Sequence, residues 1–223
     1  MQWNEAAVRK HCYDTKQRLF ICPVEDRING RQLTLAERYG VVNRSVHKGG
    51  RQRSRRNNDL PDAVKLAVGM KVMVTANIET NLNVTNGARG EIVDIILHPD
   101  EPPLSNDSTV TLKHLPSYIL IKMQRTHASQ LDGLDEGIIP VEVATRNFQI
   151  KVCTNGGKYV TRSVCRHQCP MTAAYAFTDY RSQGQTLLYV MIDIAKPPTG
   201  ALDLLNLVVS QFREGEHSIA AGF

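Results

Sequence analysis

A short polar stretch near the end of the chain carries residue types suited to holding phosphate groups. Hydroxyls and a cation can bind the phosphates of a nucleic-acid strand, a glycine lets the backbone approach closely, and glutamines add amide donors. The same residue types also suit the polar end of an ordinary surface helix, and by themselves they favour that simpler interpretation. The set comprises Thr178, Arg181, Ser182, Gln183, Gly184, Gln185 and Thr186.

A second set of candidate contacts is a basic segment at residues 43–59, which has five arginines, one lysine and almost no apolar side chain. The net charge of +5 is concentrated in the same part of the chain, because residues 1–60 carry 13 Lys/Arg against 6 Asp/Glu and the remainder carries 14 against 16. A basic region of this kind predicts a polyanionic partner, most simply nucleic acid. A solvated linker and a nuclear-import signal are the alternatives. The candidate contacts are Arg51, Arg53, Arg55 and Arg56.

Thiols and imidazoles offer a weaker possibility. Cys165, His167 and Cys169 alternate along the chain and would share one face of a strand, and Cys153 lies upstream. Three or four such ligands can bind zinc, but this spacing is not a recognised zinc pattern, so no metal is predicted. No cysteine stands in a convincing nucleophile and base arrangement, since His11 beside Cys12 and His167 do not complete such a set.

The middle of the chain consists of short strands separated by turns. Strand composition occurs at Val68–Ile78, Ala88–Leu97 and Ser117–Met123, and three more such runs follow up to residue 164. Asn86-Gly87 predicts a type I′ turn between the first two strands. Repeated short strands of this kind indicate a small barrel or sandwich.

Both flanks of this β-rich region have mixed α/β character. Residues 4–17 have helical spacing with Asn4 as a possible cap, and Leu19–Pro23 reads as a buried strand. Residues 171–185 look helical, and an apolar strand and an amphipathic helix follow. The predicted fold class is therefore α/β, with a β domain inserted into a partial parallel-sheet domain.

The composition places limits on the class of protein. Hydrophobic residues make up 42% of the chain, enough for a packed core. No apolar run approaches the roughly 20 residues that cross a bilayer, and the start of the chain lacks a signal-peptide core. Five cysteines, an odd number, fit a reducing compartment. We therefore expect an intracellular protein with no membrane partner.

Two segments give the chain a resemblance to PIF-type (petite integration frequency) DNA helicases. Leu66–Ile95 resembles the family signature in which a "G-x-x-V-M" strand leads through a variable loop to "N-G-x-x-G-x-V". Pro170–Leu187 is similar to the family's motif V, "P-L-x-x-A-x-A-x-T-I-H-K-S-Q-G-x-T-L". Arg181 stands at the lysine position, and Asp179-Tyr180 replace the usual Ile-His. The likeness covers most of residues 1–209 and looks closest to the helicases of fungal Helitron transposons.

The resemblance implies a division of the chain into parts of a motor. Residues 1–42 are similar to the first part of the second RecA-like domain, and residues 43–60 become a basic linker. Residues 61–169 look like the inserted 2B domain, a small Src-homology-3-like barrel. Residues 170–223 return to the RecA-like domain with motif V and a degenerate motif VI, in which Asn206 and Leu207 fit but the arginine finger is out of register. A frameshift near Val208–Gln211 is one explanation for that tail.

The resemblance also implies an activity, cofactors and partners. A family member is an ATP-dependent 5′-to-3′ helicase that uses ATP and Mg²⁺ and steps along single-stranded DNA in the nucleus, in repair, recombination, telomere maintenance or transposition. Residues 178–186 then couple the motor to the strand, Lys71 or Arg89 becomes a possible DNA contact, and Asn86 and Gly87 keep their structural role. No small-molecule ligand other than nucleotide is expected.

The sequence contains no G-x-x-x-x-G-K-[ST] phosphate-binding loop and no acidic Mg-binding motif. We therefore expect a C-terminal portion that works only with a missing N-terminal RecA-like domain and binds no nucleotide by itself. A non-enzymatic remnant or adaptor that binds single-stranded nucleic acid is the alternative. A β-barrel interaction module unrelated to motors is a third possibility.

Overall fold

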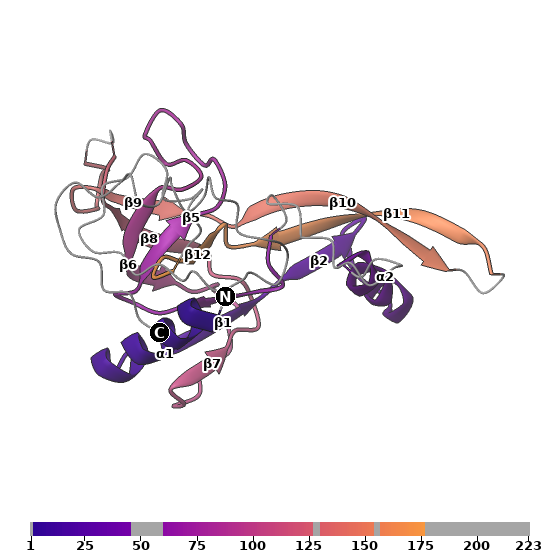
Figure 1. Cartoon of the computed structure of the whole chain (residues 1–223), viewed down its shortest axis with the longest axis horizontal. Coiled ribbons are helices and arrows are strands. Elements are labelled where there is room, and N and C mark those ends of the chain that lie inside the picture. Colours follow the sequence, from indigo (N-terminus) through magenta and orange to yellow (C-terminus); the bar gives the residue numbers. More distant parts are fainter. Residues whose placement is uncertain (1, 46–59, 127–129, 154–156, 177–223) are drawn as a thin grey trace, which may run out of the picture. The chain divides into compact units, whose positions relative to one another are not determined.

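The computed structural model describes residues 2–45, 60–126, 130–153 and 157–176 (Figure 1). Two helices and twelve strands are present in this described part. They are α1 (Gln2–Thr15), β1 (Leu19–Pro23), β2 (Glu25–Ile28), β3 (Arg31–Gln32), α2 (Leu35–Ser45), β4 (Ala63–Leu66), β5 (Lys71–Val74), β6 (Arg89–Ile96), β7 (Thr109–Thr111), β8 (Tyr118–Met123), β9 (Ile138–Val141), β10 (Ala144–Cys153), β11 (Tyr159–Gln168) and β12 (Met171–Ala173).

The strands form three sheets. One has five strands in the order β12-β5-β6-β8-β9, with every pair antiparallel. A second has the order β4-β1-β7, in which β1 and β7 run parallel. The third has the order β10-β11-β2-β3. The fold class is therefore mixed α/β, as predicted. Among the described residues β1–β7 is the one parallel pair, and no pairing joins β9 to β12.

The larger hydrophobic core lies between the five-stranded and the three-stranded sheets. Alternating side chains from their strands meet there, in the manner expected of half-buried strands. Gly90 lets β6 and β8 approach closely, since a Cβ at this position would lie 2.4 Å from Ile121 Cγ2 and 2.6 Å from the Lys122 carbonyl oxygen. The buried members include Leu66, Met70, Val72, Val74, Ile92, Ile121, Val141 and Met171.

A smaller core joins α2 to the long ribbon formed by β10 and β11 (Figure 1). Phe148, Ile150 and Val164 point from the ribbon toward the helix and pack with Ile28 and Leu33. Gly40 lets the helix backbone approach β10, where a Cβ would lie 3.1 Å from the Lys151 carbonyl oxygen. The helix therefore covers one face of the ribbon.

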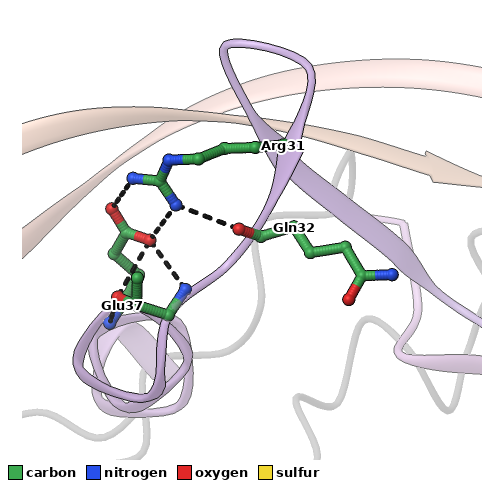
Figure 2. A network of polar contacts seen from close by, with 4 residues as sticks. Arg31, Gln32 and Glu37 are labelled. Atoms are coloured by element: carbon green, nitrogen blue, oxygen red, sulfur yellow. Dashed lines mark hydrogen bonds and ion pairs between the residues drawn. The ribbon is translucent and has the colours of Figure 1, made fainter.

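The start of α2 is fixed by a capping box (Figure 2). The Thr34 amide donates to a Glu37 carboxylate oxygen at 2.8 Å, and the Glu37 amide donates back to the Thr34 hydroxyl at 3.4 Å. Arg31 adds a two-pronged ion pair to the same carboxylate, with N–O distances of 2.7 and 2.8 Å. Arg31 and the Thr34 donors lower the pKa of the nearly buried Glu37 to about 2.

Two local predictions are wrong, and a third is correct only in part. Met171–Ala173 is a strand and not the start of a helix, because its backbone pairs with the open edge of β5 and Met171 enters the core. Asn4 does not cap α1, because it lies inside the helix and its side chain binds residues 175 and 176. The strand predicted over Val68–Ile78 is present as β5 but is shorter at both ends, Lys71–Val74.

The turn predicted at Asn86-Gly87 is present, but it is not type I′. Ala88 N–H donates to the Thr85 carbonyl oxygen at 2.9 Å, which closes a β-turn around these two residues. A type I′ turn needs positive φ at both central positions. Here Gly87 has φ +99° while Asn86 stays in the ordinary negative range, which is the pattern of a type II turn.

Neither helix in the described residues combines the length and the apolar character that crossing a membrane requires.

The capping box generates a pH-dependent stability prediction. Because the pKa of Glu37 is lowered, its stabilising contribution is complete above the unfolded-state pKa near 4.5 and is lost as the pH falls through about 2. We expect Glu37→Gln to lower the free energy of unfolding by roughly 1–2 kcal/mol at pH 7. Urea unfolding at pH 7, 5 and 3 should show that the difference in unfolding free energy between Glu37→Gln and wild type becomes smaller as the pH falls. The exposed Glu136→Gln is the control, and a difference that stays constant with pH would contradict the assignment.

Candidate functional site

Most of the predicted site residues lie outside the described residues. These are the phosphate-contacting set Thr178, Arg181, Ser182, Gln183, Gly184, Gln185 and Thr186, and the basic set Arg51, Arg53, Arg55 and Arg56. The structure does describe the segment that leads directly into residue 177. Among the described residues, the candidate functional site therefore consists of that segment and the exposed faces of the sheets.

The segment before residue 177 is held by the side chain of Asn4, which projects from α1. Its Oδ1 accepts hydrogen bonds from the backbone amides of Tyr175 and Ala176 at 3.1 and 2.6 Å. Its Nδ2 donates to the Ala176 carbonyl oxygen at 2.6 Å. One side chain thus satisfies three backbone groups immediately before the predicted coupling loop. Sequence reasoning gave Asn4 a capping role and missed this one.

Lys71 lies on the other side of the same segment. Its carbonyl oxygen accepts from the Ala174 amide at 2.9 Å, and its amide donates to the Tyr175 hydroxyl at 3.3 Å. Burial raises the pKa of the Tyr175 phenol, so this hydroxyl stays neutral. Asn4 and Lys71 together fix residues 174–176 from two elements.

The two predicted basic contacts in this region differ in what they offer a DNA strand. The register pairs Lys71 with Glu91 and Met73 with Arg89, so Lys71 and Arg89 share one face of the five-stranded sheet. Lys71 is exposed, but the carboxylate directly across the ladder reduces its local positive potential. Arg89 is half-buried, and burial lowers its pKa. Lys71 is therefore the better placed of the two for a phosphate.

The face of the β10–β11 ribbon opposite α2 forms an open polar surface. The strand register places alternate residues of β10 and β11 side by side on this face, and seven of them are exposed. They offer hydroxyls, amides, one cation and one aromatic ring, with no carboxylate among them. These seven residues, here called the ribbon face, are Thr145, Asn147, Gln149, Lys151, Tyr159, Thr161 and Ser163.

Arg166 anchors the base of the ribbon. Its buried guanidinium makes a two-pronged ion pair with Asp26 at 2.7 and 2.8 Å, and also donates to Asp62 at 3.0 Å. It donates to the Leu60 carbonyl oxygen at 3.0 Å and lies over the Phe148 ring. Burial by itself would lower the pKa of Arg166, but the two carboxylates outweigh it and raise the pKa. The cation is therefore structural and not available to a ligand.

The cysteines and histidine considered for zinc do not gather. Cys165 and His167 share a strand face, with 3.9 Å between Sγ and Nε2. Cys169 lies beyond the end of that strand in the core, where it and burial raise the pKa of the Cys22 thiol, so the expectation that it shares the face is wrong. Cys153 is exposed at the opposite end of the ribbon. The described part of the chain holds no group of three or more His, Cys, Asp or Glu that could bind a metal ion.

Comparison with known proteins first defines the class of fold. No protein-family model matches the chain. The crystal structure of Pif1 helicase from Candida albicans matches with a TM-score of 0.53 and 20% identity, over 95% of this chain and 40% of that one. The sheets are therefore arranged as in a Pif1 helicase.

The sequence is also similar to that of a particular helicase. An ATP-dependent DNA helicase PIF7 from Trypanosoma brucei brucei (strain 927/4 GUTat10.1) is 25% identical over 174 residues, or 70% of this chain and 16% of that protein. The chain thus spans less than half the length of either relative. It resembles the C-terminal portion of PIF-type DNA helicases, as the motifs predicted.

The Asn4 contacts generate a test of how the coupling segment is held. Asn4→Ala removes the partner of two amides, and a buried unpaired donor costs about 1–3 kcal/mol. We expect amide hydrogen exchange at Tyr175 and Ala176 to accelerate by roughly tenfold. Asn4→Asp keeps the acceptor but sets a carboxylate oxygen against the Ala176 carbonyl, so exchange should also accelerate. The exposed Asn147→Ala should leave both amides unchanged, and unchanged exchange in Asn4→Ala would refute the clamp.

Proposed function

We propose that this chain is a DNA-strand-binding part of an ATP-dependent 5′-to-3′ DNA helicase. The observation that carries the proposal is the ribbon face, which offers phosphate and base contacts on one exposed surface without a carboxylate. The resemblance of the chain to PIF-type helicases, and the description of the curated relative as an ATP-dependent DNA helicase, support it.

The chemistry of the ribbon face suits single-stranded nucleic acid. Hydroxyls and amides bind phosphate and sugar oxygens, and Lys151 adds a cation for the backbone. Tyr159, at the far end, is 72% exposed and presents a ring on which a base can stack. Such contacts are largely independent of sequence, as a protein that moves along a strand requires.

In this proposal the segment held by Asn4 links the strand to the motor. Residues 178–186 would contact phosphates through Arg181 and the hydroxyls of Thr178, Ser182 and Thr186, with Gly184 allowing close backbone approach. Lys71 lies beside the segment that leads into these residues. The Asn4 clamp supports the assignment, because a loop that transmits movement needs a fixed starting point.

The described residues do not fit a nucleotide and Mg²⁺ site by themselves. They hold no cluster of carboxylates for a metal ion, and the sequence contains no phosphate-binding loop. ATP and Mg²⁺ would be bound mainly by an N-terminal RecA-like domain outside this sequence. We infer that this chain alone does not hydrolyse ATP.

The proposal also assigns each part of the chain to a part of the helicase motor. Residues 1–42 and 170–223 would be parts of the second RecA-like domain, with the parallel β1–β7 pair as supporting evidence. Residues 43–60 would be a basic linker whose arginines contact DNA, and residues 61–169 an inserted 2B domain related to Src-homology-3 barrels. A nuclear role in repair, recombination, telomere maintenance or Helitron transposition follows from the family likeness.

A non-enzymatic strand-binding remnant or adaptor is the second candidate, because the ribbon face would serve it equally well. The two candidates differ in ATP turnover when the missing half is supplied. DNA-stimulated ATPase on adding a PIF-type N-terminal RecA-like domain would favour the motor. DNA binding without ATPase would favour the remnant.

Binding to a fluorescent single strand of thymidines tests the ribbon face. We expect Lys151→Glu to weaken binding of the full chain by about fivefold at low salt, because phosphate contacts are electrostatic. Tyr159→Ala should weaken binding by about fivefold or more through lost stacking, and Tyr159→Phe should retain it. The measurement is fluorescence anisotropy across a salt series.

Lys10→Glu is the matched control, because it makes the same charge change on α1 and not on the ribbon. Its effect should be clearly smaller than that of Lys151→Glu. If Lys151→Glu and Lys10→Glu weaken DNA binding equally, the loss of binding comes from net charge and the ribbon face is rejected as the binding surface. No binding of any single strand by the wild-type chain would reject the proposed function itself.

A further inference from the structure

An open groove of about 500 Å³ lies at the foot of the ribbon face. One side is formed by Glu25, Arg27 and His167, and the register places these residues in line with Thr145 and Asn147 of the ribbon face. The opposite side comes from the connection between β6 and β8, and Glu142 closes the groove beside β10. A strand lying on the ribbon face would therefore reach the groove without a break.

The walls of the groove suit a flat heteroaromatic ring. His98 and His114 stack on one another, with their centroids 4.9 Å apart and an angle of 29° between the rings. Leu115, Pro116 and Val143 add apolar surface. Imidazole and apolar side chains are common platforms for unstacked bases.

The polar groups of the groove select among ring edges. Glu25, Asp100 and Glu142 line it, and ionised carboxylates only accept hydrogen bonds. Arg27 pairs with Glu25 at 3.3 Å, while Glu142 is exposed. The Nδ1 atom of His167 is buried with no hydrogen-bond partner among the described residues. The carboxylates outnumber the one arginine among the lining residues, which disfavours a phosphate and favours a ring edge that carries an amine.

We propose that this groove receives one unpaired base of the bound strand and prefers a base with an exocyclic amine, with Glu142 as the acceptor. Cytosine presents an N4 amine that a carboxylate can accept, whereas thymine presents the O4 carbonyl at the equivalent position, which a carboxylate repels. The proposal rests on the proposed function, because it needs a strand on the ribbon face. It adds a base preference to surfaces that otherwise bind without one.

The experiment compares two single strands of twelve nucleotides, one all cytidine and one all thymidine, by fluorescence anisotropy at one salt concentration. Both carry the same phosphates, so the ratio of their dissociation constants isolates the base. We expect wild type to bind the cytidine strand about three- to tenfold more tightly, the range of one good polar contact to a base edge. Glu142→Gln should bring the ratio close to one, because an amide both donates and accepts.

Glu136→Gln removes the same charge at an exposed position outside the groove lining and should keep the wild-type ratio. A wild-type ratio near one, with both strands bound, would overturn the groove assignment and leave the proposed function standing. A ratio that survives Glu142→Gln would overturn it as well. Binding of neither strand would overturn the proposed function together with the inference.

Discussion

A buried positive charge must find partners, and Arg166 finds them in separate parts of the chain. Asp26 comes from β2, while Leu60 and Asp62 come from the segment that leads into β4. Leaving one member of such a pair buried alone costs about 3–5 kcal/mol, so the three segments must assemble together. The sheet that carries the ribbon is thereby fixed to the strands of the main core, and the ribbon face and the groove at its foot share this foundation.

The ribbon illustrates how one strand register separates structure from function. On one face Phe148, Ile150 and Val164 pack against α2, and on the other face the exposed side chains are mostly polar. A slip of one residue would exchange the two faces and would place amides and hydroxyls under the helix. The buried ion pair at one end and the helix along the covered face both oppose such a slip, so the polar surface keeps its composition.

Local pattern predicted some elements and failed for others for identifiable reasons. β6 and β8 are rich in branched apolar residues, a composition that predicts strands close to their observed places. β2 has three charged residues in four and is a strand because β11 and β3 pair with it on either side. The Thr34–Glu37 capping box was a readable signal for α2 that went unused. The Asn4 clamp and the groove depend on contacts between distant segments, which no local pattern encodes.

The clamp joins residues that are 172 positions apart in the chain. During synthesis, α1 leaves the ribosome before the rest of the described unit, yet Asn4 cannot make this contact until the chain has grown beyond Ala176. Closing so large a loop carries a high entropic cost, and folds dominated by distant contacts form slowly. Helix α1 can contact residues 65 and 68 earlier, through Glu5 and His11, but its first turn is secured only after the last strand of the described unit has been made.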